Sequence, residues 1–85
     1  MLVEIYSKEN CSLCDKAKEI IKKVSLDTDF DFVEIDITKN PEIFEKYKYD
    51  IPVIHINKII AFKHRIEEAE FRKKYLDRLE LELET

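Results

Sequence analysis

Two cysteines, Cys11 and Cys14, are the residues of this chain best suited to carry out chemistry, and the chain has no others. A bridge between them would close a very short loop, which in the chain-entropy model contributes only about 2 kcal/mol to stability. A disulfide that stabilises a small secreted domain joins distant segments and usually has several companions. The spacing therefore indicates redox chemistry, in which the two sulfurs alternate between dithiol and disulfide.

A bound metal or a shared iron–sulfur cluster is the main alternative for this pair. A closed zinc site needs four nitrogen or sulfur ligands, and only His55 and His64 are present to complete one. These histidines lack the short spacing of a paired ligand set, so we expect His55 to be a structural histidine. Redox chemistry ranks first, a metal or cluster second, and a noncatalytic adaptor third.

The pair lies between a predicted strand and a predicted helix. Residues 2–6 alternate as in a short buried strand, and apolar residues recur with helical spacing over residues 12–24. Cys11 then lies at a helix N-terminus, where unpaired backbone N–H groups and the helix dipole favour negative charge. Lys8 adds a cation upstream. We predict an exposed Cys11 nucleophile with a lowered thiol pKa and a more buried Cys14 as resolving thiol.

The remaining elements follow from turn signals and hydrophobic periodicity. We expect a strand, a short helix that begins with asparagine and proline, a hairpin and a last helix. The expected ranges are the strand 30–37, the helix from Asn40-Pro41 to residue 48, the hairpin strands 52–56 and 59–62, the turn 57–58 and the helix 67–79, with Phe71, Tyr75, Leu76 and Leu79 facing inward. The pattern leaves open whether residues 80–85 continue this helix.

The order β-α-β-α-β-β-α predicts an α/β fold. A first β-α-β unit requires parallel strands with a right-handed crossover, and the later hairpin requires an antiparallel pair. One mixed four-stranded sheet flanked by helices satisfies both requirements, in a single domain over residues 1–85. Because the chain contains no glycine, asparagine and aspartate should supply its left-handed turn positions. The candidates are Asn10, Asp27, Asn40, Asp50 and Asn57.

Two motifs resemble those of glutaredoxins within the thioredoxin-fold superfamily. The run Tyr6-Ser7-Lys8-Glu9-Asn10-Cys11-Ser12-Leu13-Cys14 is similar to the active-site approach of glutaredoxins, in which Tyr-Ser-Lys-x-x-Cys-x-x-Cys recurs. Ile51-Pro52-Val53 resembles the second motif of the fold, a cis proline that faces the cysteine pair. The resemblance covers nearly the whole chain and implies a thioredoxin-like fold and a glutaredoxin-like thiol–disulfide oxidoreductase.

The resemblance also implies a substrate site. The backbone of Ile51 would pair with a bound peptide or glutathione, next to the cis Pro52, and Lys8 would line the approach. Tyr6 would support the motif from the preceding strand. His64 and Arg65 lie where a substrate could pass.

Glutaredoxins usually carry two glycines after the fourth strand, followed by acidic residues that hold glutathione. Residues 63–68 of this chain contain no glycine, so larger side chains would crowd the approach of glutathione to the backbone. We expect a disulfide-containing protein or a small thiol as substrate. The electron donor would be glutathione, another low-molecular-weight thiol or a disulfide reductase, with no cofactor besides the Cys11–Cys14 disulfide.

Composition argues against disorder, nucleic-acid binding and membrane insertion. Leu, Ile, Val and Phe make up 28 of the 85 residues, well above the range of disordered chains, so the chain should fold. A net charge of −4 argues against binding to a nucleic-acid backbone. Since no apolar run is long enough to span a membrane and no leader precedes the first strand, we expect a cytoplasmic monomer without membrane contact.

Overall fold

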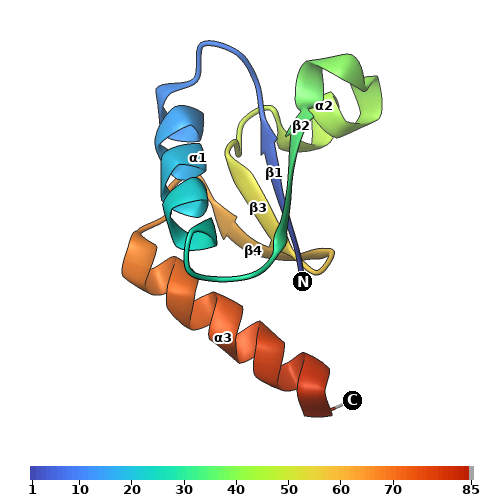
Figure 1. Cartoon of the computed structure of the whole chain (residues 1–85). Helices are drawn as coiled ribbons and strands as arrows, with labels where there is room; N and C mark the ends of the chain where they lie inside the picture. Colours follow the sequence, from blue (N-terminus) through green and yellow to red (C-terminus); the bar gives the residue numbers. More distant parts are fainter. Residues whose placement is uncertain (85) are drawn as a thin grey trace.

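The computed structural model describes residues 1–84, which form a four-stranded sheet with helices on both faces (Figure 1). The elements are β1 (Leu2–Ser7), α1 (Ser12–Ser25), β2 (Asp31–Asp36), the short 3₁₀ helix η1 (Ile37–Lys39), α2 (Pro41–Tyr47), β3 (Val53–Ile56), β4 (Ile59–Lys63) and α3 (Glu68–Glu84). This order confirms the predicted mixed α/β arrangement, to which η1 is an addition.

The sheet has the strand order β2-β1-β3-β4. β1 runs parallel to β2 and antiparallel to β3, and β4 pairs antiparallel with β3 at the other edge. Tyr6 near the end of β1 lies opposite Val53 at the start of β3. This register places the loop that follows β1, which contains Cys11, beside the segment that leads into β3, which contains Pro52.

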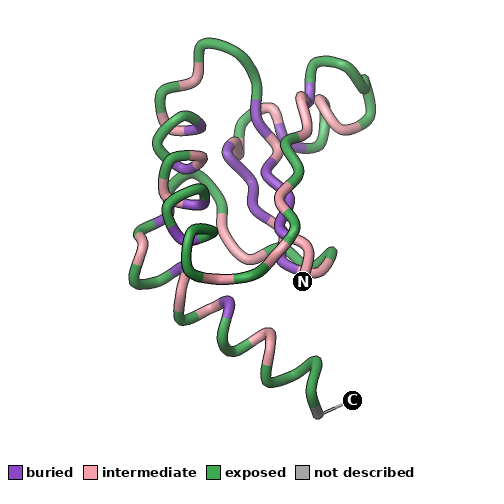
Figure 2. Tube along the Cα trace, in the orientation of Figure 1, coloured by how far each residue is buried: buried purple, intermediate pink, exposed green. Residues whose placement is uncertain are grey.

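Helices cover the two faces of the sheet unequally. α1 and α3 pack on one face, and α2 lies on the other, near one end of the strands (Figure 1). The larger core is formed by Val3, Ile5, Ala17, Ile21, Val24, Ile54, Ile56, Ile66 and Phe71. The smaller core, under α2, is formed by Ile37, Tyr47 and Val53. Figure 2 shows the buried segments concentrated along the central strands and the inner side of α1.

β2 is shorter than the strand predicted over residues 30–37. The Asp36 carboxylate accepts hydrogen bonds from the backbone N–H and the hydroxyl of Thr38, at 2.9 and 2.6 Å. These bonds turn the chain into η1, so Ile37 leaves the sheet and is buried under α2 instead. β3 likewise begins one residue later than predicted, at Val53.

The sequence leaves open whether residues 80–85 continue the last helix, α3. It continues to Glu84, so residues 80–84 are helical, while Thr85 lies outside the described residues. Phe71 and Tyr75 are buried as predicted. No helix within residues 1–84 combines the length and the apolar character needed to cross a membrane.

The inward orientation predicted for Leu76 is wrong, because this side chain is 58% exposed. The side of α3 that faces the sheet instead carries Arg78, whose guanidinium donates to the carbonyls of Ile56, Ile59 and Ile60. Leu76 lies well around the helix from that side. Leu79, also predicted inward, is only half-buried.

Four residues of the described range 1–84 adopt left-handed backbone conformations: Asn10, Asn57, Lys58 and His64, with φ of 58°, 52°, 71° and 68°. Asn10 and Asn57 confirm the expectation that asparagine replaces glycine. The prediction is wrong for Asn40, which is extended at φ −138°, and for Asp27 and Asp50. Positive φ at both central residues suits the two-residue hairpin turn between β3 and β4, and Asn57 Oδ1 also accepts from the N–H of Leu2 at 2.8 Å.

Candidate active site

Cys11 is the N-cap of α1. Its backbone is extended, and its Sγ accepts a hydrogen bond from the N–H of Cys14 at 3.2 Å. Its carbonyl oxygen accepts the first bond of the helix, from the N–H of Asp15 at 3.1 Å. The left-handed Asn10 turns the chain just before the helix. The sulfur therefore lies among the first N–H groups of α1, where the helix dipole stabilises negative charge.

Cys11 and Cys14 are joined by a disulfide, with their Cα atoms 5.2 Å apart. Cys14 is fully buried, on the side of α1 that packs against the sheet. The sequence predicts an exposed Cys11, and the structure leaves it half-buried, with its sulfur bonded to that of the buried Cys14. Of the two cysteines, Cys11 is therefore the one that is accessible to solvent.

The peptide bond between Ile51 and Pro52 is cis, as the sequence motif predicts. Pro52 is buried, and its carbonyl oxygen accepts a hydrogen bond from the N–H of His64 at 2.9 Å. The same N–H lies 3.2 Å from the carbonyl of Asp50. The left-handed turn after β4 is thus tied directly to the loop that carries the cis proline.

A shallow hollow of about 430 Å³ gathers several of the predicted site residues around Cys11. Lys8, Ile51 and His64 line this hollow together with Cys11. The sequence did not predict Lys48 and Tyr49 as site residues, although both line the hollow and Tyr49 is 82% exposed. Their place just before the cis proline motif is the signal that could have identified them.

Arg65 lies in a neighbouring hollow of about 230 Å³, which it shares with Leu13, Lys16 and His64. His64 lines both hollows, so its side chain lies between them. Lys8, Lys16 and Arg65 form no ion pair with another described residue, whereas Lys48 is paired with Glu45 at 3.0 Å. Three cations without an ion pair among the described residues therefore line the two hollows beside the disulfide.

Tyr6 does not lie in the hollow. Its ring packs against Tyr47 and His55 on the α2 side of the sheet, with centroid distances of 5.1 and 4.8 Å. Burial, with a smaller contribution from Glu4, raises the pKa of its phenol. The structure therefore places Tyr6 in the smaller core, below the active-site loop rather than beside the sulfurs.

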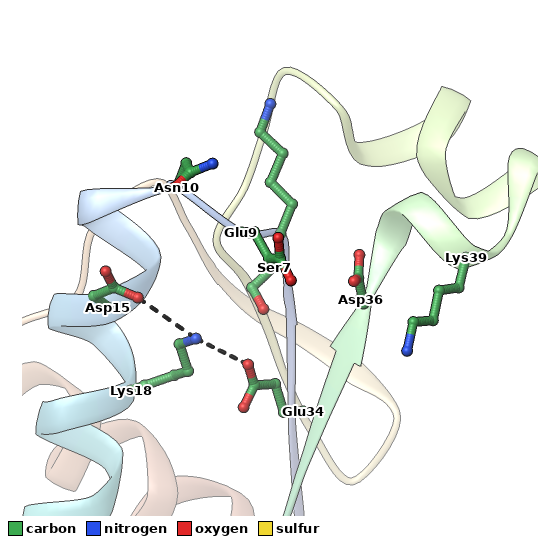
Figure 3. A pocket seen from close by; sticks show the side chains of 9 residues that line it. Ser7, Glu9, Asn10, Asp15, Lys18, Glu34, Asp36 and Lys39 are labelled. Atoms are coloured by element: carbon green, nitrogen blue, oxygen red, sulfur yellow. Dashed lines mark hydrogen bonds and ion pairs between the residues drawn. The ribbon is translucent and has the colours of Figure 1, made fainter.

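A polar groove of about 590 Å³ lies on the other side of the active-site loop, between α1 and β2 (Figure 3). Lys18 extends across it and contacts Glu34 at 2.8 Å and Asp15 at 3.6 Å. The hydrogen bond to Glu34 is the main cause that raises the pKa of Lys18. This bridge ties α1 to the edge strand, which helps to fix the helix whose N-terminus holds Cys11.

Comparison with known proteins identifies the family. The model of the family described as "Glutaredoxin-like domain (DUF836)" matches residues 2–76. The chain belongs to this glutaredoxin-like family. A curated relative, "Glutaredoxin-like protein YDR286C homolog" of Dictyostelium discoideum, is 37% identical over 90 residues, which cover 98% of this chain and 75% of the relative.

Solved structures share the fold of this glutaredoxin-like protein. The structural genomics target XcR50 from X. campestris gives a TM-score of 0.72 at 20% identity, covering 89% of this chain and 96% of that one. Thioredoxin 1 from Thermosipho africanus gives 0.71 at 21% identity, with coverage of 96% and 98%. E. coli glutaredoxin gives 0.62 at 18% identity, with coverage of 94% and 99%. The thioredoxin-like fold predicted from the sequence is thereby confirmed.

The placement of the histidines bears on the metal alternative for the cysteine pair. Within the described residues 1–84, no group of three or more His, Cys, Asp or Glu side chains is arranged to hold a metal ion. His55 packs against Tyr6 and Tyr47, and Tyr47 Oη lies 3.3 Å from its Nε2. His64 lies on the rim of the two hollows instead. The two histidines that could have completed a zinc site thus occupy separate places.

Proposed function

We propose that this glutaredoxin-like protein is a thiol–disulfide oxidoreductase in which Cys11 is the nucleophile and Cys14 the resolving thiol. One observation carries the proposal: Cys11 Sγ caps α1 and accepts the N–H of Cys14 at 3.2 Å. A thiolate at this position is stabilised by the backbone N–H group and by the helix dipole, which lowers the pKa of a cysteine thiol. The family and the disulfide support a redox role.

The proposed cycle transfers two electrons and two protons. The Cys11 thiolate attacks one sulfur of a substrate disulfide, forming a mixed disulfide and releasing the other substrate sulfur as a thiolate that takes a proton from water. Cys14 then loses its proton and attacks Cys11 Sγ. This step forms the Cys11–Cys14 disulfide and releases the second substrate thiol. Two donor thiols, or the two thiols of one donor dithiol, then reduce the Cys11–Cys14 disulfide through a mixed disulfide at Cys11 and are themselves joined in a disulfide.

The two cysteines differ in burial in the way that this cycle needs. Cys14 is fully buried, so a large substrate cannot reach it before Cys11 has reacted. Its sulfur is nevertheless within bonding reach of Cys11. Attack by Cys14 within the same molecule is therefore favoured over attack by an outside thiol, since the two groups are already held together.

We place the substrate in the hollow that contains Cys11, against Ile51 and the adjoining cis Pro52. Lys8, His64 and Arg65 would contribute positive or hydrogen-bonding groups along its edge. His64 falls in the segment where the resemblance to glutaredoxins would place glycines, so its side chain would disfavour the close backbone approach of glutathione. The donor is therefore glutathione bound differently, another small thiol, or a disulfide reductase.

The pH dependence of Cys11 alkylation tests the proposal most directly. The reduced protein should react with iodoacetamide at Cys11 with a midpoint below the ordinary thiol value of about 8.5. Cys14→Ser should keep this reactivity, whereas Cys11→Ser should lose it. A Cys11 that is inert at neutral pH would instead support a noncatalytic adaptor.

Trapping identifies the partners. Cys14→Ser should accumulate a mixed disulfide with glutathione or with a disulfide-containing protein such as insulin, because the resolving thiol is missing. Parallel assays with glutathione and with a disulfide reductase then separate the two donors. Visible absorption or stoichiometric metal in protein purified without oxygen would favour the cluster alternative over the redox one.

A further inference from the structure

The last turns of α3 carry a row of leucines that the described chain leaves uncovered. Leu76 and Leu83 are 58% and 79% exposed, and Leu79 between them is half-buried. Their spacing of three and four residues places them on one side of the helix. We call these three residues the leucine stripe. In Figure 1 this part of α3 continues beyond the sheet, and Figure 2 shows it largely exposed.

Charge is distributed unequally along the same part of α3. Lys73 and Lys74 precede the stripe, Asp77 and Arg78 lie within its range, and Glu80 accompanies its second half, whose last turn contains no basic residue. Arg72 is already paired with Asp27 and Glu68, and Glu82 accepts from Asn57 Nδ2. Carboxylates near a helix C-terminus are repelled by the negative end of the helix dipole. The exposed leucines and Glu80 would therefore be stabilised by a partner that is apolar and positively charged in the matching places.

We propose that the leucine stripe pairs with the leucine stripe of a second copy of this chain, with the two α3 helices antiparallel. In this arrangement Leu76 of each copy packs beside Leu79 of the other. Lys73 and Glu80, which lie two turns apart along one edge of the stripe, each face the opposite charge of the second copy. A parallel arrangement would place the two acidic ends together, so charge selects the antiparallel one.

The resulting dimer is isologous, because the same surface is used by both copies. It replaces the monomer expected from the sequence. A single pair of helices buries less area than a standard stable interface, so the dimer should form reversibly as concentration rises. The disulfide lies at the opposite end of the molecule, at the start of α1 (Figure 1), so both active sites remain open.

Sedimentation of the oxidised protein from low micromolar to near-millimolar concentration tests the proposal. The wild-type chain should pass from monomer to dimer over this range. Leu76→Glu should raise the dimer dissociation constant at least about tenfold, since a charge replaces a buried leucine at two symmetric positions. Leu81→Glu is the matched control, because Leu81 is 59% exposed but lies roughly 140° around the helix from Leu76.

Charge exchange tests the orientation of the helices. Lys73→Glu and Glu80→Lys should each weaken the dimer, and the double variant should restore it, because the exchanged pair again faces its opposite. Circular dichroism checks that every variant is folded, and disulfide reduction should be the same in all of them, which separates this proposal from the redox function.

Three results would overturn the proposal. The first is a wild-type protein that stays monomeric throughout the concentration range. The second is a dimer that Leu76→Glu leaves intact, or that Leu81→Glu weakens equally. The third is a double charge variant no tighter than the single ones, which would exclude the antiparallel arrangement.

Discussion

The N-termini of α1 and α2 are built alike but differ in what they can do. Cys11 Sγ accepts one backbone N–H at the start of α1, from Cys14. Asn40 Oδ1 accepts two at the start of α2, from Glu42 and Ile43 at 3.0 and 3.2 Å. The amide of Asn40 neither ionises nor forms covalent bonds under ordinary conditions, whereas a thiol does both. The same local geometry therefore serves stability at one helix and is available for chemistry at the other.

The surroundings of the two caps sharpen this difference. Cys11 lies in a hollow beside Ile51 and next to a buried sulfur with which it is bonded. Asn40 is exposed. Pro41, the next residue, fixes φ at the first helical position, where its missing backbone N–H leaves no hydrogen bond unmade. Position at a helix N-terminus is thus common to both, and the neighbouring loop makes one of them a candidate active site.

The largest effect is expected at Cys11. Serine is a favourable N-cap, so Cys11→Ser should keep α1 folded, with a melting temperature close to that of the reduced wild type. Disulfide reduction should nevertheless fall by at least about 10³-fold, because the hydroxyl is a far weaker nucleophile. Calorimetry and an insulin-reduction assay on the same preparation measure the two quantities. An active Cys11→Ser protein would contradict the nucleophile assignment.

The opposite result is expected at Asn40. Asn40→Ala should destabilise the protein by about 1 kcal/mol, since two N–H groups lose their acceptor, which corresponds to a fall in melting temperature of roughly 4–8 °C. Activity of the folded protein should not change. Asn40→Asp is the control, because a carboxylate caps equally well and interacts favourably with the dipole. A loss of activity without a loss of stability would show that the two helix ends are coupled.

The smallest effect is expected at His55, on which α2 packs through Tyr47. Burial lowers the pKa of His55 from its ordinary value of 6.5, with Glu4 opposing this shift and Lys46 and Lys58 adding to it. As pH falls below 6.5, the unfolded chain binds the proton first, so stability should decrease until the lower folded pKa is passed. His55→Gln should lack this acid-dependent loss of stability. Urea unfolding at pH 7.5 and 5.5 measures this loss of stability in the wild type and in His55→Gln. An equal change in the free energy of unfolding in both proteins would contradict the assignment to His55.

Local signals in the sequence were sufficient for the parts of the site that lie close together along the chain. The helical period over residues 12–24 and the cysteine spacing predicted α1 and the burial of Cys14. Asn40 followed by Pro41 predicted the start of α2, because the cap and the fixed φ of proline act within one turn. The cis bond at Pro52 was predicted from its motif, and the structure contains it.

Tertiary placement explains what the sequence did not predict. Leu76 continues an apolar pattern, but the direction of α3 is set by Phe71, Tyr75 and the hydrogen bonds of Arg78, which leave Leu76 outside. Tyr49 reaches the hollow around Cys11 only because β3 pairs with β1. Contacts of this kind depend on which strands become neighbours, and no short window of sequence contains that information.

The turn at His64 limits which residue types can occupy the rim of the disulfide hollow. Its left-handed backbone is held by bonds from its own N–H to the carbonyls of Pro52 and Asp50, which leave its side chain free of the turn's hydrogen bonds. The imidazole is 55% exposed, on the rim of the disulfide hollow. Asparagine or aspartate, which tolerate a left-handed backbone, could therefore replace His64 and change the rim that a substrate meets, whereas a β-branched residue would strain the turn.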